Sequence, residues 1–200
     1  LIFEMKKRNG ATSYNFRKKM SQIAFSETAY YDATISNYFN KINNNNFTQK
    51  KIIYGNLIEK LRYGENPHQF SGYYSKNLKT NLKQLQGKQL SYNNYNDIFA
   101  ALTLSKSLPK NKGTVIVKHA NPCGVSIKSN PVDSYNSALA CDPVSAFGGI
   151  VAFNSNVDKN TAMNLKNIFL ECIVAPSFDE EALNILKIKL QVSTLNLNLD

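Results

Sequence analysis

The sequence contains no tryptophan, and its 200 residues include only three cysteines and six prolines. The cysteines, Cys123, Cys141 and Cys172, are odd in number and have no short pairwise spacing, which argues against a disulfide framework and a thiolate zinc site. We expect them to be buried thiols. No apolar run approaches the length of a membrane span, and the first residues lack the order of a secretory signal. We therefore expect a cytoplasmic protein without a membrane partner.

Acidic side chains are scarce, since 14 Asp and Glu against 24 Lys and Arg give a formal net charge of +10. This charge favours anionic partners. The lysines are scattered, Asn-rich segments dilute them, and no zinc-finger, homeodomain or RNP-type signature is present, so we expect no nucleic-acid partner. A basic cleft for small anions fits the charge at least as well. With 42% hydrophobic and 19% charged residues, the chain can bury a substantial core.

The first part of the chain favours helix. Between residues 14 and 39, apolar side chains recur at roughly helical spacing, which predicts one long amphipathic helix or two short ones. Residues 40–51 are polar and include four consecutive asparagines. This segment is typical of a linker, and we expect a domain boundary near it.

The rest of the chain alternates between helix and strand patterns. A polar turn at residues 61–69 and an aromatic run at 72–74 come first. After them, apolar spacing and capping residues predict helices and strands in alternation, the rhythm of an α/β layer. The expected helices are 90–108, 135–140, 159–168 and a last one starting at 180–186, and the expected strands are 114–117, 150–153 and 172–176.

Lys118 and His119 form the most informative pair. They follow the β-branched run 115–117 and precede Ala-Asn-Pro-Cys-Gly at 120–124, so we expect a buried strand that ends in a turn. Strand ends of α/β sheets commonly face the crevice that binds ligands. A neighbouring cation and partial burial would favour the neutral, proton-accepting imidazole. A histidine at the edge of the core beside a solvated lysine remains the alternative.

Five motifs occur in one order: RYGENPHQ at 62–69, LSYNNYND at 90–97, VKHANPCG at 117–124, CDPVSAFGG at 141–149 and ECIVAPSFDEEAL at 171–183. Together they resemble the bifunctional purine biosynthesis family that combines phosphoribosylaminoimidazolecarboxamide formyltransferase with inosine monophosphate (IMP) cyclohydrolase. Five ordered motifs over roughly 120 residues are far more specific than one motif match.

The resemblance implies an α/β fold in two parts. Residues 1–45 would be the helical C-terminal end of the cyclohydrolase domain, and residues 46–200 the N-terminal part of the transformylase domain, a cytidine-deaminase-like layered sheet with flanking helices. Leu1 is not an initiator Met, and the chain stops without an obvious terminating element. We therefore expect a piece of a longer protein, without the cyclohydrolase core and the second half of the transformylase.

The implied reaction transfers a formyl group from the co-substrate 10-formyltetrahydrofolate to the 5-amino group of aminoimidazole carboxamide ribonucleotide (AICAR). His119 matches the family's general base. Lys118 matches the residue that protonates the leaving folate nitrogen or stabilises the oxyanion. The family shares this site between two subunits, which implies a homodimer for the full-length protein. We expect no metal ligand among the site residues.

The resemblance also assigns substrate-binding residues. Arg62 and Tyr63 match a nucleotide-binding pair, and Asn94, Gly148 and Glu171 match further nucleotide contacts. Two other polar residues lie within the motifs. His68 is either a second catalytic imidazole or a turn-stabilising residue, and Asn121 is expected to cap local backbone in a turn.

Two alternatives stay open. A zinc-dependent deaminase is the sharper one, because residues 119–123 superficially resemble the metal-binding elements of such enzymes. However, Asn121 stands where the acid/base Glu belongs and Ser126 where the second thiolate belongs. The other alternative is a non-catalytic module that keeps a nucleotide half-site and a dimer surface.

Overall fold

The computed structural model describes residues 1–77, 82–187 and 193–197. The chain divides into two compact units, one made of Leu1–Asn56 with Tyr74–Leu78 and the other of Leu57–Tyr73 with Lys79–Asp200. The expectation that the chain stops without a terminating element concerns its last residues. Of these, residues 198–200 lie outside the described ranges.

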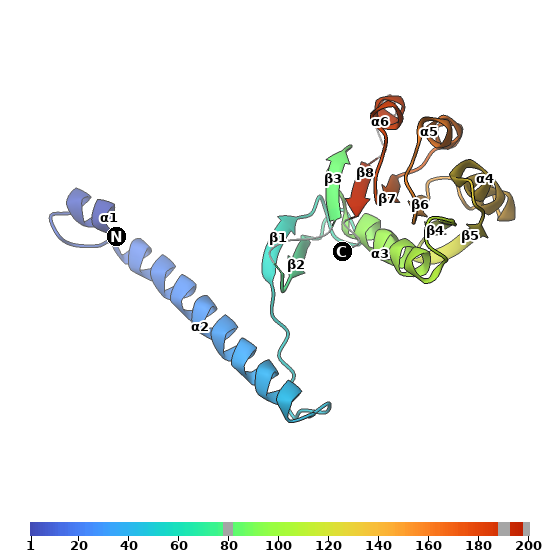
Figure 1. Ribbon diagram of the computed structural model, residues 1–200. Coiled ribbons are helices and arrows are strands. Elements are labelled where there is room, and N and C mark those ends of the chain that lie inside the picture. The colour runs from blue at the N-terminus through green and yellow to red at the C-terminus, as the bar shows by residue number, and fades with distance from the viewer. Residues whose placement is uncertain (78–81, 188–192, 198–200) are drawn as a thin grey trace. The chain divides into compact units, whose positions relative to one another are not determined.

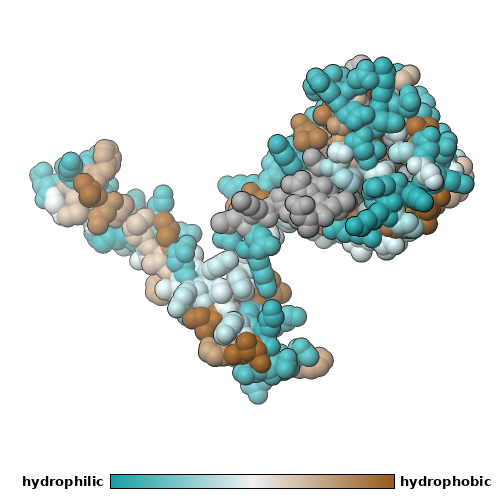
Figure 2. Space-filling view, in the orientation of Figure 1, coloured by the Kyte–Doolittle hydropathy of each residue, from teal (hydrophilic) through white to brown (hydrophobic). Residues whose placement is uncertain are grey.

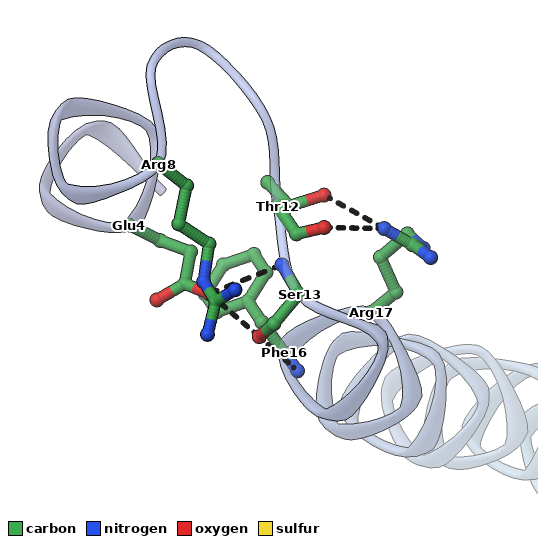
Figure 3. A network of polar contacts seen from close by, with 6 residues as sticks. All are labelled: Glu4, Arg8, Thr12, Ser13, Phe16 and Arg17. Carbon is green, nitrogen blue, oxygen red and sulfur yellow. Dashed lines mark hydrogen bonds and ion pairs between the residues drawn. The ribbon is translucent and has the colours of Figure 1, made fainter.

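The first unit is built on one long helix. The apolar spacing at residues 14–39 forms a single helix, α2, at Tyr14–Ile42, which follows the short α1 at Ile2–Lys7. Ser13 caps α2, because its hydroxyl accepts a hydrogen bond from the Phe16 amide at 3.2 Å (Figure 3). The Glu4 carboxylate accepts from the Ser13 hydroxyl at 2.6 Å and binds Arg8 at 3.0 Å. These contacts tie α1 to the first turn of α2.

Most of the α2 surface is exposed. Ala33 is its only buried residue, and several of its large apolar side chains are open to solvent, as the brown patches along the helix in Figure 2 show. One stretch of the helix is covered, because Tyr30 packs edge-on against Tyr54 with ring centroids 4.9 Å apart, and its hydroxyl accepts from Asn56 at 3.2 Å. No helix in the described part of the chain combines the length and apolar character needed to cross a bilayer.

The second unit contains a six-stranded mixed sheet with the order β3-β8-β7-β6-β4-β5 (Figure 1). Strands β6, β7 and β8 are parallel to one another, and the remaining pairings are antiparallel. A separate two-stranded sheet pairs β1 with β2. The strand bounds are β1 Asn56–Lys60, β2 Gly72–Ser75, β3 Leu82–Gln86, β4 Gly113–Lys118, β5 Asn121–Ile127, β6 Ile150–Phe153, β7 Cys172–Ala175 and β8 Ser193–Leu197.

Helices cover both faces of the large sheet. Alternate residues of β4, β6 and β7 point to opposite faces, so each face has its own apolar core. Helix α3, Tyr92–Ser107, packs on one face through Ile98, Ala101 and Leu102. On the other face lie α4, α5 and α6, which appear together on one side of the sheet in Figure 1. Their bounds are α4 Pro131–Cys141, α5 Lys159–Leu165 and α6 Glu180–Lys187. The α/β class with flanking helices is therefore confirmed.

The segment after Lys118 differs from the prediction. Asn-Pro-Cys-Gly was expected to form a turn, but it begins β5, and only His119 and Ala120 separate β4 from β5. Pro122 is tolerated because β5 is an edge strand of the sheet. Gly124 allows β5 to approach α4 closely, since a Cβ atom at this position would lie 2.0 Å from the Ala138 carbonyl oxygen.

Tyr135 of α4 is fully buried, and its hydroxyl has no hydrogen-bond partner in the described part of the chain. Burial raises the pKa of Tyr135 to about 12. Between pH 10 and 12 the unfolded chain therefore loses this proton while the folded protein keeps it, and the free energy of unfolding falls as pH rises.

We expect Tyr135→Phe to change the free energy of unfolding by no more than about 1 kcal/mol at pH 8, because the lost hydroxyl is unpaired. At pH 11.5 the difference in free energy of unfolding between the variant and the wild type should have shifted by about 1–2 kcal/mol in favour of the variant, compared with the same difference at pH 8. Urea unfolding of both proteins at the two pH values measures the change. Contributions from all other groups are common to the two proteins and cancel in the difference. Parallel pH dependences would contradict the prediction.

Candidate functional site

The N-terminus of α3 organises one corner of the site. Ser91 and Asn94 form a capping box, in which the Asn94 amide nitrogen donates to the Ser91 hydroxyl at 3.3 Å and the Ser91 amide donates to the Asn94 side-chain oxygen at 3.0 Å. The buried Asn94 side chain then donates through Nδ2 to the Glu171 carboxylate at 2.5 Å. Asn94 thus caps the helix with its oxygen and orients Glu171 with its nitrogen.

Arg62 and Tyr63 are attached to the same helix start by backbone hydrogen bonds. The Arg62 amide donates to the Leu90 carbonyl at 3.0 Å, and the Tyr92 amide donates to the Tyr63 carbonyl at 3.1 Å. The Arg62 guanidinium lies 4.7 Å from the centre of the Tyr63 ring and donates to its hydroxyl at 3.1 Å. Arg62 is exposed and Tyr63 half-buried, so the pair presents a cation to solvent beside a partly covered aromatic ring.

Gly148 lies in a turn attached to the segment before β7. Its amide donates to the Phe169 carbonyl at 2.8 Å, and the Glu171 amide donates to the Gly149 carbonyl at 3.0 Å. Gly148 has a φ of +74°, and a Cβ atom there would meet nothing closer than 3.8 Å. The backbone conformation, rather than lack of space, therefore explains the glycine.

Lys118 reaches this turn from the end of β4. Its ammonium donates to the Phe147 carbonyl at 2.7 Å, and a Cβ atom on Gly148 would lie 4.0 Å from Nζ. The side chain is half-buried. Lys118 is therefore held with its charge beside Gly148, which brings together two residues that the motifs place about thirty positions apart.

His119 and Ala120 form the two-residue loop between β4 and β5. Their φ values are +54° and +59°, as a type I′ hairpin turn requires. Such loops favour Asn-Gly, and a non-glycine residue in the left-handed region costs roughly 1–2 kcal/mol. His119 is exposed, so the predicted partial burial is wrong. It is exposed because a tight loop at the tip of an edge hairpin projects out of the sheet.

Side chains hold the backbone of this loop from both directions. The Asp97 carboxylate of α3 accepts from the Ala120 amide at 2.7 Å and from the His119 amide at 3.3 Å. The Asn121 side chain donates to the His119 carbonyl at 2.8 Å, which confirms its predicted capping of local backbone. Asp97 belongs to the LSYNNYND motif, but its spacing gave no sign that it would contact residues 119 and 120.

All seven predicted site residues lie in the second unit, at or attached to one end of its large sheet. Because β4 runs antiparallel to β6, the carboxyl end of β4 meets the amino ends of β6 and β7. The usual crevice at the carboxyl ends of parallel strands therefore does not describe this site. Contacts run from α3 through Glu171, the 147–149 turn and Lys118 to His119, and return through Asp97 to α3.

The remaining candidates are less closely tied to this end of the sheet. His68 is exposed in the 61–69 turn, which the Gln69 carbonyl closes by accepting a hydrogen bond from the Gly64 amide at 2.9 Å.

The three cysteines differ in burial. Cys172 is buried and Cys123 half-buried, and burial raises the pKa of both thiols. Cys141 is exposed, so the prediction of three buried thiols is wrong for this residue. Residues 1–77, 82–187 and 193–197 contain no group of three or more His, Cys, Asp or Glu able to hold a metal ion.

Comparison with known proteins agrees with the motifs. The family model described as the AICARFT/IMPCHase bienzyme matches residues 1–200. The protein named bifunctional purine biosynthesis protein PurH from Prochlorococcus marinus (strain MIT 9515) is 48% identical over 210 residues, covering 98% of this chain and 40% of the relative. PurH from Rhizobium meliloti (strain 1021) is 47% identical over 180 residues, covering 87% and 34%. The chain thus spans about 40% of the length of the P. marinus relative, and it belongs to the AICARFT/IMPCHase bienzyme family.

Proposed function

We propose that the protein containing this chain transfers a formyl group from 10-formyltetrahydrofolate to the 5-amino group of AICAR, and that in full length it also cyclises the product to IMP. The observation that carries the proposal is the convergence of Lys118, Gly148 and Glu171 at the sheet end that His119 borders. The names of the relatives, bifunctional purine biosynthesis protein, support it.

The chemical problem is a poor nucleophile. The amine of AICAR is delocalised into an electron-poor ring, so it must lose a proton as it attacks the formyl carbon. We assign this proton to His119. The imidazole stands on a loop whose amide and carbonyl are both held by side chains, at 3.3 Å and 2.8 Å, while the side chain itself is exposed to solvent. Rigid backbone with an accessible ring suits a general base.

Lys118 is assigned to the other half of the transfer. As the tetrahedral intermediate collapses, the folate nitrogen must gain a proton, and the formyl oxygen carries negative charge before that. An ammonium has three N–H donors. The Phe147 carbonyl takes one of them at 2.7 Å, which fixes the direction of the side chain and leaves the others for the reacting group.

The nucleotide would be held by the remaining residues. The Arg62 guanidinium suits phosphate or carboxamide oxygens, and the Tyr63 ring beside it can stack or donate. Glu171 can accept from ribose hydroxyls or from the carboxamide NH2, oriented by its contact with Asn94, which we also assign to the nucleotide contacts. At Gly148 the absent side chain would let the nucleotide approach the backbone.

The finer organisation follows the same proposal. Residues 1–45 would be the end of the cyclohydrolase domain, and residues 46–200 the first part of a cytidine-deaminase-like transformylase domain. We propose a cytoplasmic homodimer for the full-length protein, with AICAR and folate as its partners rather than nucleic acid or membrane. The 40% coverage of the P. marinus relative supports the view that other site residues lie elsewhere in the protein.

The test is a formyl-transfer assay on the longest form of the protein that its gene encodes, with AICAR and 10-formyltetrahydrofolate. Product should form only when both substrates are present, and metal analysis should find no stoichiometric zinc. An intact, folded dimer without activity would favour the non-catalytic binding module. Tightly bound zinc in an amount equal to the protein would instead favour the deaminase alternative.

A further inference from the structure

We propose that Asp97 is a positioning residue for the formyl transfer, holding the His119-Ala120 loop in the conformation that presents the imidazole. This inference rests on the proposed function, in which His119 is the base. Asp97 acts through the backbone of the loop and not through contact with a reactant.

The contact is specific in its geometry. Each oxygen of the carboxylate takes one amide, Oδ2 that of His119 at 3.3 Å and Oδ1 that of Ala120 at 2.7 Å. In the β4–β5 ladder Lys118 pairs with Asn121, so the two loop amides lie outside the ladder. A carboxylate can serve both amides at once because each of its two oxygens is an acceptor, whereas a carboxamide offers one acceptor and one donor.

The element that carries Asp97 is rigid. Ile98 and Ala101 of α3 are completely buried against the sheet, and the capping box of Ser91 and Asn94 fixes the start of the helix. A residue on such an element can impose a conformation on a loop. The loop itself is an exposed hairpin tip, and neither of its residues is a glycine.

This loop needs external support, since both residues adopt positive φ values that side chains disfavour. When the Asp97 contact is lost, the hairpin gains access to other loop conformations. The imidazole then spends less time in the reactive position. A displacement of about 1 Å at a reacting group can lower turnover by about 10²-fold, although substrate binding is retained.

The experiment compares Asp97→Asn with the wild type in the longest form of the protein that its gene encodes. We expect kcat for formyl transfer to fall by about 10–100-fold while KM for AICAR changes by less than about threefold. Asp158→Asn is the matched control, because Asp158 also accepts a backbone amide, that of Thr161 at 2.8 Å, at the start of α5. The control should keep the wild-type kcat.

A second substitution separates positioning from general loss of structure. Glycine adopts positive φ without the penalty of a side chain. Ala120→Gly should therefore restore at least about threefold of the lost kcat in the Asp97→Asn background, and leave kcat near the wild-type value when made alone. Should Asp97→Asn fail to fold, Asp97→Glu, which keeps both oxygens but shifts them by a methylene, replaces it with the same expected rescue.

The outcomes separate the two proposals. Suppose that the wild-type protein is active, that His119→Ala abolishes this activity, and that the folded Asp97 variant keeps it within twofold. This result would overturn the positioning role and leave the proposed function in place. A fall in kcat that Ala120→Gly does not relieve would also overturn it. Absence of formyl transfer in the folded wild-type protein would overturn the proposed function, and this inference with it.

Discussion

Replacement of His119 by alanine is expected to lower kcat for formyl transfer by about 10²–10⁴-fold, while the affinity for AICAR stays within about tenfold of the wild type. The imidazole is exposed on a loop tip, so its removal leaves no cavity and disturbs no core contact. The loss should therefore fall on the transition state, where the amine gives up its proton. Steady-state kinetics and equilibrium binding of AICAR measure the two quantities.

Lys118 provides the companion measurement. Lys118→Ala should lose activity as His119→Ala does, because the charge beside Gly148 disappears. Lys118→Arg keeps the charge, but its guanidinium does not release a proton near neutral pH. Substantial activity in the arginine variant would assign Lys118 to stabilisation of the oxyanion. Loss of activity in that variant would assign Lys118 to protonation of the leaving nitrogen.

The outcome that contradicts the first prediction is an unchanged turnover in His119→Ala, which would remove His119 from the mechanism.

Gly124→Ala is expected to be the most destabilising single-methyl substitution in this fold. The added Cβ would lie 2.0 Å from the Ala138 oxygen and 2.8 Å from its carbonyl carbon, both of them backbone atoms of α4. A backbone contact this short cannot be relieved by a rotamer change, so α4 must move away from β5. We expect a loss of at least about 2–3 kcal/mol in the free energy of unfolding.

This loss should be visible by urea unfolding, and hydrogen exchange of peptides from β5 and α4 should show where it arises. Gly55→Ala is a matched control in the first unit, since its added Cβ would contact Ser75 backbone atoms at 3.3–3.4 Å. That variant should lose less than about 1 kcal/mol. A Gly124→Ala protein with the wild-type unfolding midpoint would show that β5 and α4 do not pack in this way.

The regular elements of the second unit could be predicted because periodicity and burial coincide there. Strands β4, β6 and β7 are short apolar runs buried on both faces, and α3 and α4 carry apolar residues at helical spacing. Strand β5 could not be predicted. Its Asn-Pro-Cys-Gly start consists of residues typical of turns, while the true loop, His119-Ala120, lacks the glycine or asparagine that indicates a type I′ turn.

The edge and outer strands were missed for a related reason. The sequence of β3, Leu-Lys-Gln-Leu-Gln, is mostly polar and too short for periodicity to distinguish it from a loop. Its pairing with β8 depends on residues more than a hundred positions away. Such long-range pairing is determined by the tertiary fold and leaves little trace in local sequence.

In the candidate site, too, some features could be predicted from the sequence and others could not. The candidate catalytic and binding side chains could be named from their motifs, because the residue type of a lysine, histidine, arginine or glutamate fixes its functional group. Their partners could not, since Lys118 binds the Phe147 carbonyl and Asp97 binds two backbone amides. Every residue has these backbone groups, so only the fold determines which of them lie near a given side chain.

Asn94 and Asp97 stand three residues apart on one face of α3, and one holds Glu171 while the other holds the His119 loop. A small movement of this helix over the sheet would therefore carry both groups in the same direction. The spacing between the Glu171 carboxylate and the His119 loop would then change less than the position of either one. In the proposed reaction, α3 would thus serve as a common reference for the carboxylate assigned to nucleotide binding and the loop that carries the proposed base.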